Sequence, residues 1–373
     1  MRVRCWLILS ILIGLFGCGG GNDGGTQPVI PATQKPGVLA ISALPRLDPL
    51  PTTSQEFAAR AQEAFDMSYT TGARGQFNSF TWATLEPTQG TYDAQKFDEL
   101  NSAIATAQTR GMVELVGLQV INTNSRDLPA DLMALPFNDP AVIARFHALL
   151  DRVLTSAHRG QIRYLSIGNE VDAYLRVNPQ EWPQYGAFYR DAVAYAHTLD
   201  PNVKVGVTGT ADGALVHSPM ELTELNSASD VVILTYYPLQ FSLQGDVTVR
   251  SPTVVASDFP QLLNFAGAKP LVLQEVGYPA ATLNASSDAL QAQFITNVFG
   301  AWRNANGKIP FLNYFLLHDF PQPLCDDLSV KYGAANNASF NAFLCSLGLR
   351  TVNGTPRSGW NVLTTEAQAA GLP

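Results

Sequence analysis

Two glutamates, each directly after an amide residue, end apolar segments in separate halves of the chain. Glu170 follows Asn169 in YLSIGNE, and Glu275 follows Gln274 in LVLQEV. Both segments have the composition of buried strands, so each carboxyl group lies where a rigid element meets a loop. A pair of carboxylic acids can break a glycosidic bond, because one protonates the leaving oxygen while the other attacks the sugar or activates water. Glu170 and Glu275 are our candidate catalytic residues, with a helix cap as the structural alternative for Glu170.

Short β-rich segments alternate with longer helical segments from residue 37 onward. The predicted strands cover 37–43, 73–80, 112–121, 162–169, 203–210, 230–237, 270–277 and 309–317. The predicted helices cover 54–68, 93–110, 140–158, 181–199, 218–226, 256–267 and 286–304. Asp93, Asp139 and Ser286 have residue types that cap helices at their first turns.

This alternation predicts an α/β fold, a (β/α)8 TIM barrel that forms a single catalytic domain over residues 37–373. A doubly wound open sheet is the alternative. Such a sheet usually carries a Gly-rich phosphate turn after its first strand, and ISALPRLDP has none. The barrel is therefore the favoured fold.

In a TIM barrel the active site is built at the carboxyl ends of the strands. Outside the two glutamate pairs, the polar and aromatic residues at these ends include Trp82, Glu86, Gln119, Asn122, Tyr236, Tyr237, Tyr278, His318 and Asp319. We expect Trp82, Asn122, Asn169, Tyr236, Tyr237 and His318 to bind substrate. Core packing is the alternative for Trp82, and a hydrogen-bonded structural role is the alternative for His318. Glu86 is expected to anchor the turn before Pro87.

The motifs IGNE, TYYP and QEVGYP, which end the fourth, sixth and seventh predicted strands, resemble those of the retaining clan-A glycoside hydrolases. They are nearest to those of the endo-β-1,4-galactanase branch, and they also resemble, less closely, those of the cellulase and β-1,3-glucanase families. The segment SFTWATLEPTQG also resembles the end of the second strand in these barrels. Many of these enzymes carry a Trp at the end of strand eight, where FLNYFLLHDF offers His318 and Phe320 instead.

The resemblance implies a role for each matched residue. Glu170 would be the acid/base, Glu275 the nucleophile, and Asn169 the amide that binds the sugar 2-hydroxyl, while Tyr236 or Tyr237 would orient Glu275. We then expect burial to raise the pKa of Glu170 and Glu275 to stay ionised. The implied activity is hydrolysis of a β-linked polysaccharide or oligosaccharide by double displacement with retention. A non-catalytic carbohydrate-binding surface lipoprotein is the alternative, and a structural surface protein would leave these residues unexplained.

The amino terminus resembles an export signal. Arg2 and Arg4 precede an apolar segment, 6–16, that is too short to span a bilayer. Leu15–Cys18 resembles a bacterial lipobox, which predicts a lipoprotein signal peptide over 1–17, lipidation of Cys18 and a flexible tether over 18–36. The predicted location is the outer membrane, through the lipid anchor only. Ordinary secretion to the periplasm or beyond, with Cys18 discarded, is the alternative.

Cys325 and Cys345 are the two cysteines of the predicted catalytic domain, and in an exported protein we expect them to form a disulfide. No cysteine or histidine stands near them at zinc-like spacing, so no metal site and no cofactor is predicted. The net charge is −8 and no Lys/Arg cluster is present, which argues against a nucleic-acid partner. No protein partner can be inferred from the sequence.

Overall fold

The computed structural model describes residues 36–243 and 245–373. The predicted signal peptide, Cys18 and all of the predicted tether except its last residue lie outside the described residues. Within them, none of the helices is both long and apolar enough to cross a membrane.

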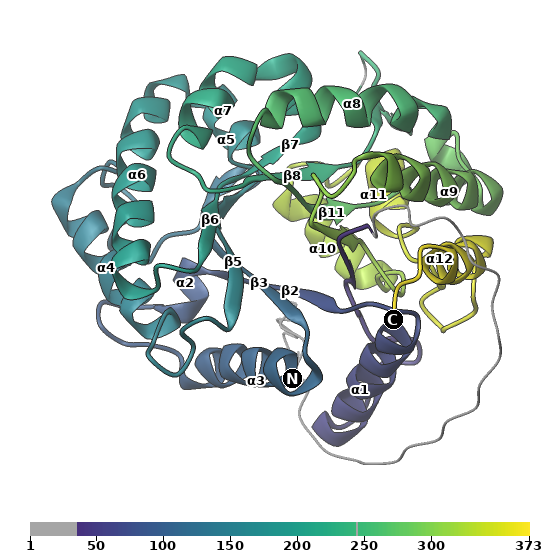
Figure 1. Ribbon diagram of the computed structural model, residues 1–373, viewed down its shortest axis with the longest axis horizontal. Coiled ribbons are helices and arrows are strands. Elements are labelled where there is room, and N and C mark those ends of the chain that lie inside the picture. Colours follow the sequence, from purple (N-terminus) through teal and green to yellow (C-terminus); the bar gives the residue numbers. More distant parts are fainter. Residues whose placement is uncertain (1–35, 244) are drawn as a thin grey trace.

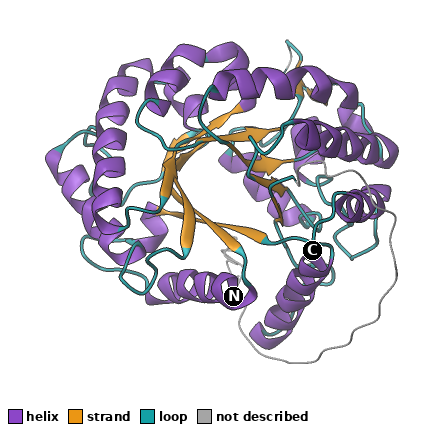
Figure 2. Ribbon diagram, in the orientation of Figure 1, coloured by secondary structure: helices purple, strands orange, loops and turns teal. Residues whose placement is uncertain are grey.

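The centre of the molecule is a nearly closed barrel of parallel strands, shown in orange in Figure 2. Its strands are β1 (Val38–Ile41), β2 (Gly75–Thr81), β3 (Val113–Asn122), β5 (Ile162–Asn169), β6 (Lys204–Gly206), β7 (Thr208–Thr210), β8 (Val232–Tyr236), β11 (Leu271–Val276) and β12 (Phe311–Tyr314). Only Val207 separates β6 from β7, and these two pair with β5 and β8 respectively, which brings the ends of the sheet together. All eight predicted strand positions and the (β/α)8 fold are confirmed.

Helices surround the barrel (Figure 1). They are α1 (Ser54–Thr70), α2 (Trp82–Leu85), α3 (Ala94–Arg110), α4 (Pro140–Val153), α5 (Val171–Val177), α6 (Trp182–Leu199), α7 (Pro219–Asn226), α8 (Val255–Ala266), α9 (Asp288–Asn304), α10 (Gln322–Lys331), α11 (Ala338–Leu344) and α12 (Ser358–Ala369). Short helical turns cover Pro179–Glu181, Gly213–His217, Pro252–Val254 and Thr282–Asn284. The remaining strands are β4 (Ser125–Arg126), which pairs with β3, and the hairpin of β9 (Leu239–Phe241) and β10 (Val247–Val249).

Helix starts follow the sequence signals with one exception. The Asp93 carboxylate accepts a hydrogen bond from the Lys96 amide at 3.0 Å, and that of Asp139 accepts one from the Ala141 amide at 2.8 Å. The expected cap at Ser286 is wrong, because Ser287 caps α9. The hydroxyl of Ser286 instead donates to the carbonyl of Pro279.

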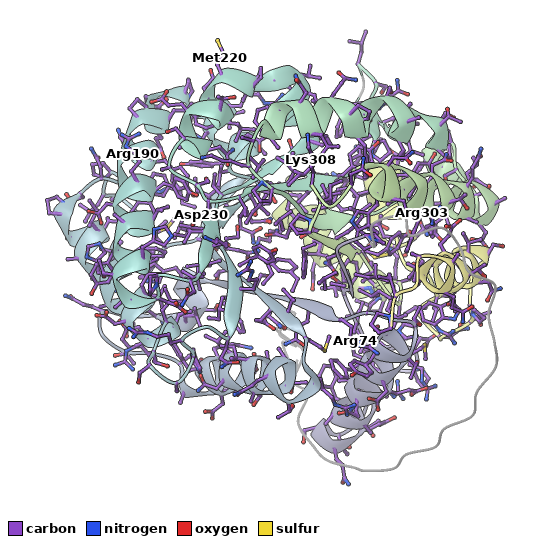
Figure 3. All side chains as sticks on the ribbon, in the orientation of Figure 1. Arg74, Arg190, Met220, Asp230, Arg303 and Lys308 are labelled. Atoms are coloured by element: carbon purple, nitrogen blue, oxygen red, sulfur yellow. A yellow bond between two sulfur atoms is a disulfide. The ribbon has the colours of Figure 1, made fainter. Side chains whose placement is uncertain are left out.

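The interior of the barrel changes character along its axis. An apolar cluster, which we call the apolar plug, fills it near the amino ends of the strands; its members include Ala40, Leu115, Tyr164, Ile233, Val272 and Phe311. Two residues further along the same strands come Ser42, Ser166, Thr235, Gln274 and Asn313, the polar layer. Alternate strand residues face the same side, so both sets point inward. Figure 3 labels Arg74, Asp230 and Lys308, which precede β2, β8 and β12 and so mark the plug end.

A segment between β12 and α12 covers part of the other end of the barrel. It contains α10 and α11, which the predicted disulfide joins, with the Cα atoms of Cys325 and Cys345 5.8 Å apart. On one side Ser339 accepts a hydrogen bond from the Val247 amide at 2.8 Å, which ties α11 to the β9–β10 hairpin. On the other side Asn124 donates to the carbonyl of Lys331 at 3.3 Å. This α10–α11 segment therefore reaches from the hairpin to the turn after β3.

Candidate active site

Glu170 stands at the end of β5 with both carboxylate oxygens hydrogen-bonded. The hydroxyl of Thr123, after β3, donates to Oε2 at 2.8 Å, and the hydroxyl of Thr235, on β8, donates to Oε1 at 2.7 Å. Glu170 occupies the N-cap position of α5, but its side chain makes no capping hydrogen bond. The helix-cap alternative is therefore not realised, and the carboxyl group is held inside the barrel mouth.

The backbone at Glu170 is strained. Its φ of 48° lies in the left-handed region, which costs a residue with a side chain about 1–2 kcal/mol. Gly168 just before it has a φ of 87°, and a Cβ there would lie 2.4 Å from the hydroxyl of Tyr185. Such backbone strain clusters at functional sites, where surrounding contacts enforce it. Here the strain turns the Glu170 carboxyl group toward Thr123 and Thr235.

Glu275 faces the same space from β11. The register between β8 and β11 shifts just before Glu275, a local irregularity of the kind that redirects a side chain. After the shift, Glu275 pairs with Thr235, the residue whose hydroxyl binds Glu170. The phenol of Tyr237 donates to Oε2 of Glu275 at 2.7 Å. Glu170 is therefore hydrogen-bonded to the residue that lies beside Glu275 in the sheet.

The two amide residues connect the glutamate strands beneath the carboxyl groups. Gln274 donates from Nε2 to Oδ1 of Asn169 at 2.8 Å, and its own Oε1 accepts from the Thr208 hydroxyl at 2.8 Å. The Asn313 amide donates to the carbonyl of Gln274 at 2.9 Å. Since Oδ1 of Asn169 is used in this way, its amino group is left to face the cleft, 3.5 Å from the hydroxyl of Thr123. The polar layer thus fixes the orientation of the amide that was expected to bind the sugar.

Both carboxyl groups open into one cleft of about 1670 Å³. Its lining includes Asn122, Asn169, Tyr237, Phe315 and Tyr332. Asn122 and Tyr237 therefore lie where the sequence placed them, at the mouth and within reach of a bound sugar. Of the two tyrosines proposed to orient Glu275, Tyr237 is the one in contact with it.

Tyr236 points away from Glu275, to the outside of the barrel. Its hydroxyl donates to Oδ2 of Asp258 at 2.8 Å, and its ring packs edge-on against Phe259. It is 1% exposed. Successive residues of a strand face opposite sides, so Tyr237 and Tyr236 could not both reach Glu275. Tyr236 is among the residues that line the cleft, but its burial leaves almost none of its side chain for a substrate to contact.

Trp82 and His318 are also structural residues. Trp82 is 0% exposed, donates from Nε1 to Glu86 at 2.9 Å and packs edge-on against Phe146, so it offers no face to a sugar. Glu86 also pairs with Arg145, as expected of a turn anchor.

His318 is buried against the carbonyl of Leu44, to which Nδ1 donates at 2.7 Å. Burial lowers the pKa of His318 to about 4, and the expected substrate contacts of Trp82 and His318 are wrong.

The cleft residues that escaped the sequence analysis include Thr123, Thr235, Phe315 and Tyr332. Thr123 and Thr235 bind Glu170, but an isolated Thr in a strand carries no signal of that role. Phe315 lines the cleft at the end of β12, close to the His318 and Phe320 that were expected to take the place of a Trp. Burial and the charges of both glutamates raise the pKa of Tyr332, which places its phenol near the two carboxyl groups.

Burial raises the pKa of both catalytic candidates. For Glu170 the hydroxyls of Thr235 and Thr123 oppose this rise, and the charge of Asp172 adds to it. The pKa of Glu275 rises to about 8, first through burial and then through the charge of Glu170, although the Tyr237 hydrogen bond lowers it. The rise at Glu170 was expected, whereas Glu275 was expected to remain ionised. Two carboxyl groups that repel in this way titrate together as a pair, so the loss of one proton makes the loss of the other harder.

Among residues 36–243 and 245–373, no group of three or more His, Cys, Asp or Glu side chains is placed to hold a metal ion. The cleft therefore presents carboxyl, hydroxyl, amide and aromatic groups to a ligand. Such groups can move a proton, attack an electrophilic carbon and hydrogen-bond hydroxyl groups.

The fold is similar to those of solved glycoside hydrolases. A GH5_18 protein from Streptomyces cattleya, in complex with GlcNAc, matches with a TM-score of 0.69 at 17% identity, over 90% of this chain and 81% of that chain. An exo-beta-1,4-mannosidase from an Opitutaceae bacterium matches with a TM-score of 0.68 at 17% identity, over 92% and 62% of the two chains. A family 39 glycoside hydrolase from Bacteroides cellulosilyticus matches with a TM-score of 0.58 at 13% identity, over 91% and 65%. No protein-family pattern and no curated protein matches the sequence.

Proposed function

We propose that this protein is a retaining glycoside hydrolase that cleaves a β-linked oligosaccharide or polysaccharide, with Glu275 as nucleophile and Glu170 as acid/base. The observation that carries the proposal is the arrangement around Thr235. This residue pairs with Glu275 in the sheet and donates to Glu170, and both glutamates line one cleft. That proximity favours the spacing of roughly 5–5.5 Å used for direct attack over the wider spacing that admits a water molecule.

The chemistry follows from the hydrogen bonds. Tyr237 holds Oε2 of Glu275, which leaves Oε1 to attack the anomeric carbon. Protonated Glu170 donates its proton to the leaving oxygen as the glycosidic bond breaks. Esterification removes the charge of Glu275, so the pKa of Glu170 falls and its carboxylate can take a proton from the incoming water. Hydrolysis of the ester returns the carboxylate of Glu275.

The sugar is a finer part of the proposal. The sequence motifs are nearest to β-1,4-galactanases, whereas the structural neighbours include an exo-beta-1,4-mannosidase and a GH5_18 protein in complex with Manb1-4GlcNAc. The substrate panel should therefore contain β-galactans, β-mannans, Manβ1-4GlcNAc and β-glucans. New reducing ends would identify the sugar, and NMR of the first product formed should show retention of anomeric configuration.

Glu275→Gln should abolish turnover of the substrate so identified, because the amide cannot form the glycosyl ester. Glu224→Gln is the matched control, since Glu224 is exposed on α7 and does not line the cleft. An inverted product, or near wild-type turnover by Glu275→Gln, would overturn the assignment of the nucleophile. Sugar binding without turnover by the wild type would favour the alternative of a carbohydrate-binding protein.

We also propose that the protein is exported and anchored to the outer membrane by lipidation of Cys18. The support is the lipobox-like Leu15–Cys18 and the Gly-rich segment after it. Cys18→Ser should release the protein from the membrane fraction or stop its processing. A soluble wild type cleaved elsewhere than before Cys18 would contradict the anchor.

A further inference from the structure

The rim of the cleft is apolar in a way that sugar binding does not require. In the part of the chain that the structure describes, nine large hydrophobic side chains are exposed, and four of them line this one cleft. Three of the four we call the apolar rim: Val216 and Phe241, each 63% exposed, and Val330, 64% exposed. The fourth, Leu50, lies in the loop after β1. Exposed apolar side chains gathered at one place mark a binding surface more often than scattered ones do.

The apolar rim lies on segments joined to residues that are next to Glu170 or hydrogen-bonded to it. Val216 follows β7 in the turn whose first residue, Gly213, is hydrogen-bonded to Thr210, and the Thr210 hydroxyl donates to Asp172, two residues after Glu170. Phe241 is on β9, directly after the strand that carries Thr235. Val330 precedes Lys331, which is hydrogen-bonded to the turn after β3 beside Thr123. Because Glu170 protonates the leaving oxygen in the proposed function, the rim lies on the side of the leaving group.

The type of side chain on the rim also matters. Sugar faces stack on flat aromatic rings, and this cleft offers such rings at Tyr237, Phe315 and Tyr332. Two of the three rim residues are valines. Branched aliphatic side chains offer no flat face to a sugar, but they gain free energy by removing CH2 groups from water.

We infer that the leaving-group side of this cleft also takes an apolar aglycone, so that β-glycosides of hydrophobic alcohols, such as glycolipids, are among its substrates. This inference rests on the proposed function and names the substrate class of the same site. The sugar occupies the space beside Glu275, Asn169 and Tyr237. The alkyl chain lies along Val216, Phe241 and Val330.

The test is a series of alkyl β-D-mannosides, β-D-galactosides and β-D-glucosides from methyl to decyl, each below its critical micelle concentration. For the accepted sugar, kcat/KM should rise with chain length by up to about fourfold for each buried CH2. A paired change, Val216→Ser with Val330→Ser, should flatten this rise while turnover of the methyl glycoside stays within about twofold. Val177→Ser is the matched control, because Val177 is 70% exposed and lies outside the cleft lining.

Hydrolysis that is independent of chain length would overturn the inference and leave the proposed function intact. A rise that persists equally in the paired variant would also overturn it, because the chain would then bind elsewhere. If no alkyl glycoside is hydrolysed, calorimetric affinities of the same series for the wild type and the paired variant decide the inference, while the substrate panel above decides the proposed function separately. Affinity that grows with chain length only when the valines are present would sustain it, and a flat series would end it.

Discussion

The two ends of the barrel interior are built from the same strands and have opposite chemistry. Tyr164, Ile233, Val272 and Phe311 fill the plug end, and the inward residues two positions later are Ser166, Thr235, Gln274 and Asn313. The apolar plug and the hydrogen-bonded polar layer are therefore only two residues apart along each strand, which is the distance between successive inward-facing side chains. The plug end gains free energy by burying apolar surface, whereas the carboxyl end buries two carboxyl groups whose pKa values are raised.

This difference teaches that stability and chemistry are assigned to separate layers of one barrel. The polar layer connects them, because Gln274 and Asn313 sit directly above the plug and orient Asn169 and β11 beneath the carboxyl groups. A substitution at the plug end should then lower the free energy of unfolding and leave kcat of the folded molecules nearly unchanged. A substitution at the carboxyl end should lower kcat and leave the free energy of unfolding nearly unchanged.

The largest expected effect is at Glu170. Glu170→Ala should lower kcat on the natural substrate by about 10²–10⁴-fold, the usual contribution of a general acid/base. Activity on an aryl glycoside with a good leaving group should fall less, and azide should restore turnover by entering the vacated space. The melting temperature should stay unchanged or rise, since a buried carboxyl group on strained backbone is removed. A large loss of stability without a loss of rate would break the comparison.

At the plug end, Phe311→Ala should destabilise the protein by about 3–5 kcal/mol, because the ring is fully buried and packs edge-on against Tyr164. Denaturant unfolding measures this loss, and active-site titration should show normal kcat for the molecules that remain folded. Phe241→Ala is the control for the removal of a phenyl ring, since Phe241 is 63% exposed and its loss should change stability by less than about 0.5 kcal/mol. An equal loss of unfolding free energy in Phe311→Ala and Phe241→Ala would show that the apolar plug makes no special contribution to stability.

The disulfide is expected to stabilise the α10–α11 segment, which covers part of the carboxyl end of the barrel. It joins residues 20 apart, and the loop-entropy estimate for that separation is about 3 kcal/mol. Reduction with dithiothreitol should lower the free energy of unfolding by this amount and raise KM, because Tyr332 lies in the loop between the bridged helices. The double change Cys325→Ser with Cys345→Ser should reproduce both effects and no longer respond to dithiothreitol. Native thiols that alkylate freely without reductant would contradict the bridge.

The smallest effect expected is a shift in pH dependence at Tyr237. Its hydrogen bond lowers the pKa of Glu275, so Tyr237→Phe should raise that pKa. Because the nucleophile must be ionised, the acid limb of the kcat/KM profile should move to higher pH, by up to about one unit, the equivalent of a ~1 kcal/mol hydrogen bond. Tyr236→Phe is the control, since its hydroxyl binds Asp258, and its profile should keep the wild-type acid limb. A shift of the same size in both variants would refute the contact as its cause.

The sequence by itself determined the order and type of the barrel strands, the helices between them and the strand ends that carry Glu170 and Glu275. These features follow from local hydrophobic period and from the rule that sites lie at the carboxyl ends of barrel strands. The disulfide could also be predicted, because the export signal expected at the amino terminus implied an oxidising compartment for Cys325 and Cys345. Local composition was enough to predict those elements whose structure depends mainly on residues close to them in the sequence.

Only the tertiary structure decided which of the nearby side chains reach the site. In β8 the side chain of Tyr236 points to the outside of the barrel, so Tyr237 is the tyrosine that binds Glu275. The packing of α2 against the barrel buries Trp82. Thr123 and Tyr332 come to the carboxyl groups from β3 and from the segment after β12, which are more than 200 residues apart in sequence. Such contacts depend on strand register and on the path of a long excursion, and neither leaves a periodic signal in the chain.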